Sequence, residues 1–275
     1  MEEELWKLCE AECFEFLKRN YSNANVKFVQ DGASDSTVSD IQVFKKNVAC
    51  FYIESKMKSA QCGQFVLIPN KDKTFEYSQR NKYECSAAAS YIIGKMDDEF
   101  DKFAKAGTRG QDLGLDDTYY YSWIIDFYQN CKQVKYFIVE KDTGNANLNP
   151  DNFVIFPIEK LHKYMGVSAT YREKKSGSSS PSASLFQEIQ NSLDRAGKKH
   201  EAPFIKNGKA FIKIDANEKF QVTGEKYDYQ FNPQGDGSFE IRKLSNTRNS
   251  NVIFSIWLKS DQKEDDLETF KRDLI

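Results

Sequence analysis

Two carboxylates and a lysine in the first quarter of the chain have the residue types needed for metal-assisted phosphodiester hydrolysis. Asp40 precedes the apolar run "IQVF", and Glu54 and Lys56 end the run "ACFYIE". The residues "KKN" between the two runs predict antiparallel strands joined by a tight turn. Alternate side chains of a strand share a face, so we expect Glu54 and Lys56 to point the same way and Asp40 to lie beside them.

Converging carboxylates at the end of a sheet form an oxygen-rich site for a hard divalent cation such as Mg²⁺. We therefore expect Asp40 and Glu54 to bind Mg²⁺, and Lys56 to orient or deprotonate the attacking water. A structural ion pair is the alternative, because the D/E-x-K triplet recurs at 173–175 and 261–263. Of the three triplets, that of Glu54 ends an apolar strand and has an aspartate placed to come alongside.

Gln61 and Gln64 follow the lysine by five and eight positions. They are expected either to begin a polar helix or to support the attacking water or the scissile phosphate. The spacing does not rank one glutamine above the other.

The segment "TYREKKSGS" is expected to be a basic loop that contacts DNA, although most basic loops are simply solvated. Glycine allows the backbone to approach DNA closely, and Arg or Lys can pair with the O6 and N7 atoms of guanine. For any single residue, phosphate contact is the more common outcome. The candidates are Arg172, Lys174, Lys175 and Ser176.

A second candidate for DNA contact is "SNTRNSN", residues 245–251, between two expected strands. Its side chains Asn246, Arg248 and Asn249 are of the types that read adenine and guanine edges. An ordinary Asn-rich hairpin turn explains the same composition equally well.

Helical and strand-like patterns alternate along the chain, which predicts an α/β or α+β fold. Helices are expected at 3–19, within 83–105, at 120–127, 158–165 and 184–196. Strands are expected at 41–44, 49–54, 135–140, 153–158, 210–214, 238–244 and 252–258, followed by a charged tail. The linker-like "SGSSSPSAS" suggests a core over 1–177 that contains the hairpin of Asp40, Glu54 and Lys56, and a C-terminal part over 178–275 that completes the DNA-binding surface, unless the chain is one domain.

Composition narrows the class of protein. With 275 residues and 40% hydrophobic content, the chain can bury a substantial core. It has no apolar run of roughly 20 residues and begins with the acidic "MEEELWK", so we expect a cytoplasmic protein. Six cysteines without a CxxC pair and two histidines disfavour a zinc site and a disulfide scaffold, and favour reduced, mostly buried thiols.

The charge is unevenly distributed. The total is −2, which does not suggest a nonspecific nucleic-acid binder. Residues 152–259 carry 17 basic and 11 acidic side chains, a net of +6, which leaves −8 for the rest of the chain. This asymmetry predicts a basic face.

Several separated blocks of the sequence resemble type II restriction endonucleases of the PD-(D/E)xK nuclease superfamily. They are "SDSTVSDI" followed by "FYIESKMKSAQCGQFVLIPN", then "YSWIIDFYQ", "FVIFPIEKLHKYMGVSATYREKKSGS" and "RKLSNTRNSNVIFSIWLK". The resemblance implies a central mixed sheet flanked by helices, with additional C-terminal strands. It also implies that Asp40 and Glu54 are the metal carboxylates and Lys56 the motif lysine, although Ser39 stands where the superfamily has its proline.

The resemblance further implies Mg²⁺-dependent cleavage of double-stranded DNA at a short GC-only palindrome such as GCGC. A cognate DNA methyltransferase would protect the DNA of the prokaryotic host. The alternatives are a DNA-binding protein or inactive nuclease homologue that does not cleave, and an enzyme acting on RNA or a structured junction. The oligomeric state is left open by the sequence.

Overall fold

The computed structural model describes residues 2–31, 39–144, 148–175, 178–244 and 248–275. The chain forms two compact units: unit 1 comprises Met1–Arg172 and Asn251–Ile275, and unit 2 comprises Glu173–Ser250. The division expected from sequence, 1–177 and 178–275, assigned the last strand and the charged tail to the second part. The structure groups residues 251–275 with unit 1, so unit 2 is inserted into unit 1.

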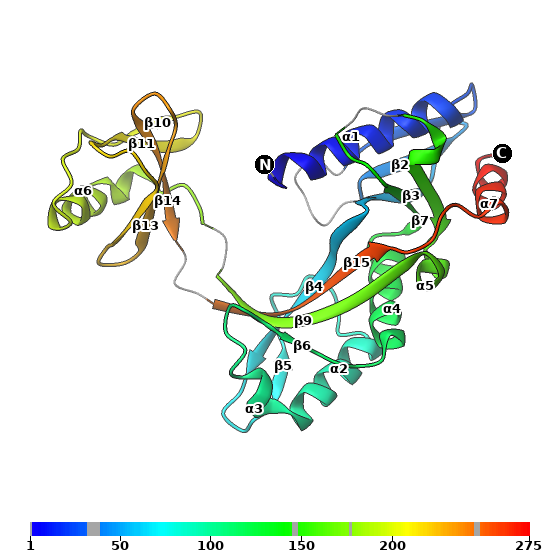
Figure 1. Ribbon diagram of the computed structural model, residues 1–275, viewed down its shortest axis with the longest axis horizontal. Helices are drawn as coiled ribbons and strands as arrows, with labels where there is room; N and C mark the ends of the chain where they lie inside the picture. Colours follow the sequence, from blue (N-terminus) through cyan, green and yellow to red (C-terminus); the bar gives the residue numbers. More distant parts are fainter. Residues whose placement is uncertain (1, 32–38, 145–147, 176–177, 245–247) are drawn as a thin grey trace. The chain divides into compact units, whose positions relative to one another are not determined.

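Unit 1 is built on a central mixed sheet, here called sheet A (Figure 1). Its spatial order is β1-β2-β3-β7-β8, in which β3 and β7 run parallel and the other neighbours antiparallel. The strands span Val26–Gln30 (β1), Ile41–Lys45 (β2), Val48–Met57 (β3), Val134–Glu140 (β7) and Phe153–Pro157 (β8). The expected mixed sheet and α+β fold class are confirmed.

The expected hairpin at 41–54 is present as β2 and β3. Its two loop residues, Lys46 and Asn47, have φ values of 50° and 66°, as a two-residue type I′ turn requires. The turn pairs Lys45 with Val48, and a one-residue register shift between Phe44 and Val43 then pairs Ile41 with Ile53. Asp40, one residue before Ile41, is thereby brought alongside Glu54.

Two helices cover one face of sheet A. Helix α1 (Glu2–Tyr21) buries Cys13, Phe16 and Leu17 against the sheet, and crosses it in Figure 1. Helix α7 (Glu264–Leu274) buries Phe270 and Leu274 in the same cluster. The residues expected to be a charged tail are therefore an amphipathic helix, whose apolar side chains recur at i and i+4.

The other face of sheet A packs against a second sheet, sheet B, and its helices. Sheet B has the order β5-β4-β15-β9-β6. Its strands span Phe75–Tyr77 (β5), Ser59–Pro69 (β4), Arg248–Leu258 (β15), Met165–Lys175 (β9) and Gln111–Asp112 (β6). Its helices are α2 (Ala87–Asp98), α3 (Phe100–Phe103), α4 (Asp117–Asp126) with a π-helical turn at Phe127–Cys131, and α5 (Leu161–Tyr164).

Two expectations for sheet B were wrong. The segment "TYREKK" is not a loop but the end of strand β9, which is buried at Val167, Ala169 and Tyr171. Gln61 and Gln64 do not begin a helix; they lie on strand β4. From Val167 to Arg172, strand β9 alternates buried and half-buried side chains, the period of a strand packed on one face.

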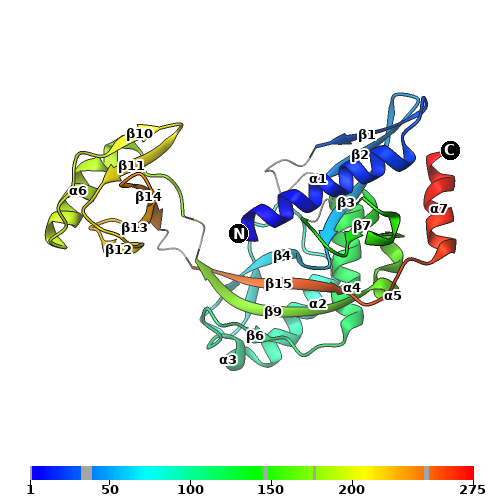
Figure 2. The ribbon, with the colours of Figure 1, turned by 45° about the horizontal axis from the view of Figure 1, so that its top comes forward.

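Unit 2 is an antiparallel sheet, sheet C, of order β10-β11-β14-β13-β12 (Figure 2). Its strands span Phe204–Lys206 (β10), Lys209–Lys213 (β11), Phe220–Thr223 (β12), Asp228–Pro233 (β13) and Ser238–Leu244 (β14). Helix α6 (Phe186–Arg195) packs Ile189 and Leu193 onto the sheet. The helix expected at 184–196 and the strands expected at 210–214 and 238–244 are confirmed, whereas β10, β12 and β13 were not anticipated. Within the described ranges, no helix is long and apolar enough to cross a lipid bilayer.

Candidate active site

The structure brings the three predicted catalytic residues together where β2 and β3 meet. Asp40 is buried, with 8% of its surface exposed, and its carboxylate accepts a hydrogen bond of 2.7 Å from the backbone N–H of Ser55. Glu54 is buried on β3, and the Nζ of Lys56 lies 2.6 Å from its Oε1 atom. The alternation of strand β3 therefore places Glu54 and Lys56 on one face, as expected.

A second lysine, which the sequence did not reveal, binds the same glutamate. The Nζ of Lys132 lies 3.2 Å from both carboxylate oxygens of Glu54. Its side chain is 6% exposed, so this ion pair is shielded from water. The ammonium groups of Lys56 and Lys132 also lie 5.5 and 5.1 Å from the ring centre of Tyr128.

An irregular backbone holds Lys132 in this position. The π-helical turn Phe127–Cys131 ends at Lys132, and the next residue, Gln133, has a φ of 55° in the left-handed region. The Oγ of Ser39, adjacent to Asp40, donates a 2.9 Å hydrogen bond to the carbonyl oxygen of Lys132. Isolated π-helical turns and left-handed non-glycine residues are often found at functional sites.

Burial and neighbouring charges perturb the ionisation of this cluster. Burial, followed by the charge of Glu54, raises the pKa of Asp40 to about 7. Burial alone would raise the pKa of Glu54 as well, but the charges of Lys56 and Lys132 hold it below its usual range. Burial would lower the pKa of Lys56, but Glu54 and Asp40 raise it, so this ammonium group stays charged at neutral pH.

A third carboxylate comes from helix α1. Burial raises the pKa of the half-buried Glu10, and the next largest influences on it are the charges of Lys56, Glu54 and Lys132. Glu10 therefore lies within electrostatic reach of the cluster. The apolar stripe of helix α1 predicted that the helix packs on the rest of the fold. Neither Glu10 nor Lys132 follows a spacing pattern that would have placed it near the site.

The glutamines Gln61 and Gln64 are exposed on β4 and hydrogen-bonded to each other, with 3.2 Å between Nε2 of Gln61 and Oε1 of Gln64. Residues three apart in a regular strand point to opposite faces. Gly63, between them, has a φ of 90°, which interrupts the alternation and lets the two amides meet. Their part in the reaction stays a prediction.

Two of the predicted DNA-contacting residues, Arg172 and Asn249, have described side chains and lie on strands β9 and β15. Arg172 is half-buried on β9, and its Nε atom makes no hydrogen bond to any described residue. Asn249 is half-buried on β15. Ser176, Asn246 and the side chains of Lys174, Lys175 and Arg248 lie outside the described residues.

The donor set at Asp40 and Glu54 fits a hard divalent cation. Both side chains offer carboxylate oxygens, the ligands that Mg²⁺ takes in proteins. The charge of Glu54 helps to raise the pKa of Asp40, so the two carboxylates oppose each other's ionisation and a cation between them would relieve that repulsion.

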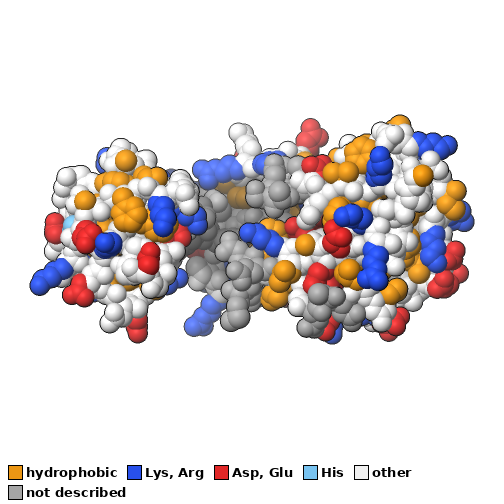
Figure 3. Space-filling view, turned by 90° about the horizontal axis from the view of Figure 1, so that it is seen from above, with side chains coloured by type: hydrophobic (Ala, Val, Ile, Leu, Met, Phe, Trp, Pro, Cys, Tyr) orange, Lys and Arg blue, Asp and Glu red, His pale blue; other side chains and the backbone are white. Residues whose placement is uncertain are grey.

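Charge differs between the two units. Residues 173–250 carry 13 basic and 10 acidic side chains, a net of +3, which leaves −5 for unit 1 because the chain totals −2. On the face seen in Figure 3, basic and acidic side chains are interspersed over unit 2. On that face, the basic side chains of unit 2 are therefore mixed with acidic ones and do not form a purely basic patch.

Comparison with solved structures finds a match over almost the whole length of the chain. HhaI endonuclease, solved in complex with DNA, shares 35% sequence identity and a TM-score of 0.79, and the match covers 98% of each chain. No family model matches the sequence, and no curated protein does. From the identity and the coverage, the chain belongs to the HhaI family of type II restriction endonucleases, within the PD-(D/E)xK superfamily.

Proposed function

We propose that this protein is a Mg²⁺-dependent endonuclease that cleaves both strands of DNA at a specific short sequence. One observation carries the proposal: Asp40, Glu54 and Lys56 converge in a buried cluster, in a chain whose relative was solved on DNA. The same geometry in an unrelated fold would support only a structural ion pair, because buried salt bridges also occur without catalytic duty.

Asp40 and Glu54 are the residues proposed to hold the cation. When bound, Mg²⁺ would supply electrostatic stabilisation of the charge that develops on the phosphate. Glu10 lies within electrostatic reach of the same cluster.

Lys56 is proposed to act as a cation that positions the attacking water or a phosphate oxygen. Of the two roles considered from sequence, orientation and deprotonation of water, the electrostatics favour orientation. A lysine whose pKa is raised by two carboxylates keeps its proton and is a poor general base. The in-line displacement expected of this class leaves 5′-phosphate and 3′-hydroxyl ends.

Lys132 is proposed to be a positioning residue that acts through Glu54. Its ammonium group contacts both oxygens of the carboxylate, which fixes the carboxylate plane while Lys56 contacts one oxygen. Two cations on one glutamate also keep it ionised despite its burial. An ionised, oriented carboxylate is the form that a divalent cation can bind.

DNA recognition is proposed for the segments that join the units, including Arg172 and Asn249, and for the net positive unit 2. A GC-only palindrome such as GCGC is the proposed site, and a cognate DNA methyltransferase in the same prokaryotic cytoplasm is the proposed functional partner. The support for GCGC is the family relationship, together with the tendency of Arg and Lys to read guanine.

Digestion of a plasmid of known sequence with the purified protein tests the proposal. We expect discrete fragments with MgCl₂, none with EDTA, and ends that all map to one short sequence. Failure to cleave with Mg²⁺, Mn²⁺ or Co²⁺ would show a binding protein or inactive homologue. Faster cleavage of RNA or of a branched junction would show that the substrate class is wrong.

A further inference from the structure

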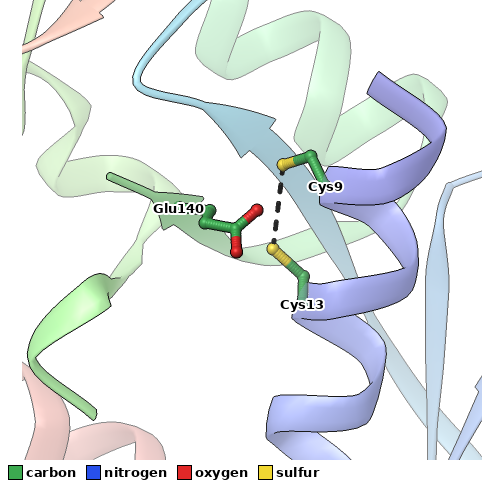
Figure 4. A group of neighbouring side chains, drawn as sticks. All are labelled: Cys9, Cys13 and Glu140. Carbon is green, nitrogen blue, oxygen red and sulfur yellow. Dashed lines mark hydrogen bonds between the residues drawn. The ribbon is translucent and has the colours of Figure 1, made fainter. Parts of the chain in front are cut away.

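Two thiols and a carboxyl group that the proposed reaction does not use meet between helix α1 and strand β7. Cys9 and Cys13 lie on the buried face of α1, and Glu140 is the last residue of β7 (Figure 4). The sulfur atoms are 4.0 Å apart, and one ligand atom from each of the three residues lies within 4.8 Å of the others. The exposed fractions are 2%, 0% and 0%, so the group is closed to bulk water.

The spacing of the sulfur atoms suits a tetrahedral metal ion. Residues at i and i+4 of a helix share a face, so both thiols are directed toward Glu140 without distortion of α1. Two thiolates bound at about 2.3 Å with a tetrahedral angle lie about 3.8 Å apart. The observed 4.0 Å is close to that separation and far from the roughly 2.05 Å of a disulfide.

Glu140 is a buried carboxyl group whose hydrogen-bonding capacity is incompletely used. Its Oε2 atom has no hydrogen-bond partner among the described residues, and its Oε1 accepts a long hydrogen bond of 3.4 Å from Asn152. A buried carboxyl oxygen without a hydrogen-bond partner destabilises a fold, whereas coordination of a cation would satisfy it.

We propose that Cys9, Cys13 and Glu140 form a structural site for a thiophilic divalent cation of the Zn²⁺ class, which the lack of a CxxC pair had disfavoured in the sequence. Two sulfur donors beside an oxygen donor suit Zn²⁺, whereas the oxygen donors of Asp40 and Glu54 suit Mg²⁺. Binding would release the protons of the thiols and of Glu140. The bound ion would tie α1 to the end of β7, which pairs with β3 at Met57, next to Lys56.

Co²⁺ and Cd²⁺ added as chlorides are suitable probes, because thiolate ligands give charge-transfer absorption that carboxylates do not. The starting protein is the full chain carrying Cys50→Ser and Cys85→Ser, which removes the two exposed thiols. It is refolded from denaturant with each metal, so that the closed site is accessible during loading. We expect saturation of the thiolate band at one equivalent of metal.

In the same background, Cys9→Ser and Cys13→Ser are each expected to abolish the band. Glu140→Gln should weaken Co²⁺ binding at least ten-fold, because a neutral amide replaces a carboxylate ligand. Asp40→Asn should leave the band and its stoichiometry unchanged, which separates this site from the proposed catalytic centre. Far-UV circular dichroism establishes that each variant is folded without metal.

The proposal is overturned if the folded starting protein shows no thiolate band at one equivalent, or if the band persists in Cys9→Ser and Cys13→Ser. Thermal unfolding with ZnCl₂ is the second measurement. Zn²⁺ should raise the midpoint of the starting protein and not that of Cys9→Ser. An equal rise in both would place the bound Zn²⁺ elsewhere.

Discussion

Lys132 and Glu54, which are 78 residues apart in the chain, form a buried ion pair in which one ammonium group contacts both carboxylate oxygens at 3.2 Å. Lys56 approaches the same carboxylate at 2.6 Å from within its own strand. The glutamate proposed to bind a cation is therefore already held by two cations. The orientation and the charge of the Glu54 carboxylate therefore depend on Lys132, which lies between the π-helical turn and strand β7.

Replacement of Lys132 by Met should lower the cleavage rate at least ten-fold and change its pH dependence. Loss of a positive charge beside Glu54 raises the pKa of that carboxylate, so the acidic limb of the pH–rate profile should move to higher pH. Lys132→Arg retains the charge and should recover part of the rate and the original limb. A Lys132→Met enzyme with reduced activity but an unshifted profile would contradict a role through Glu54.

Replacement of Lys56 by Ala should lower cleavage by about 10²–10⁴-fold, the usual range for loss of a positioned group that assists the reaction. DNA binding in Ca²⁺, measured by a mobility shift, should persist because the residue is proposed to act on the reacting groups. Lys58→Ala is the matched control, since Lys58 is exposed just beyond the end of the same strand. Unchanged cleavage by Lys56→Ala would rule out the assigned role.

Replacement of Asp40 by Asn should stabilise the metal-free protein at pH 8 and have little effect near pH 4. The pKa of Asp40 is about 7 when folded and 3.8 in its ordinary state, so the folded protein holds a proton that the unfolded chain has released. Stability from this group is therefore lost as pH rises from about 4 to about 7. The gain in the free energy of unfolding is at most about 4 kcal/mol, which corresponds to the difference between a pKa of about 7 and one of 3.8.

Urea unfolding of wild type and Asp40→Asn across this pH range measures that difference. Addition of MgCl₂ at pH 8 should stabilise the wild type more than the variant, because the cation binds the folded state through the carboxylate. If Mg²⁺ stabilises both equally, Asp40 is not a ligand.

Replacement of Gly166 by Ala should destabilise unit 1 by about 1–3 kcal/mol, the cost of overpacking. A Cβ atom at Gly166 on β9 would lie 2.2 Å from the indole ring of Trp257 on the neighbouring strand β15. Gly94→Ala is the control, because its Cβ would meet nothing within 4 Å and alanine favours the helix α2. Gly94→Ala should be neutral or stabilising in urea unfolding, and equal effects of the two would refute the steric explanation.

Replacement of Arg172 by Ala tests the proposed reading of guanine. Loss of a bidentate contact to guanine should cost about 1–3 kcal/mol of binding and relax selectivity at one base pair. Loss of a phosphate contact should instead weaken binding to all sequences alike. Sequencing of the DNA ends produced by wild type and variant distinguishes a base contact from a phosphate contact. A required A·T pair in the wild-type site would exclude GCGC and would leave the nuclease proposal intact.

Local pattern was sufficient to predict the β2–β3 hairpin that carries Glu54 and Lys56. The apolar runs at 41–44 and 49–54, the two-residue turn between them and the alternation of Glu54 with Lys56 are short-range features. Each depends on neighbours within a few residues, where strand periodicity and turn chemistry act. The same reasoning predicted helix α1, whose buried stripe spans several turns.

Tertiary structure decided which distant residues join the cluster of Asp40, Glu54 and Lys56. It also decided which strands carry the residues proposed to contact DNA. Lys132 enters the cluster because a π-helical turn and a left-handed Gln133 redirect the chain, and the sequence carries no periodic signal for either. Cys9 and Glu140 lie on separate elements and meet only because α1 packs across sheet A. Segment 170–175 was predicted to be a loop because its basic side chains masked the strand. A strand is stabilised by the neighbours it pairs with, which local composition does not specify.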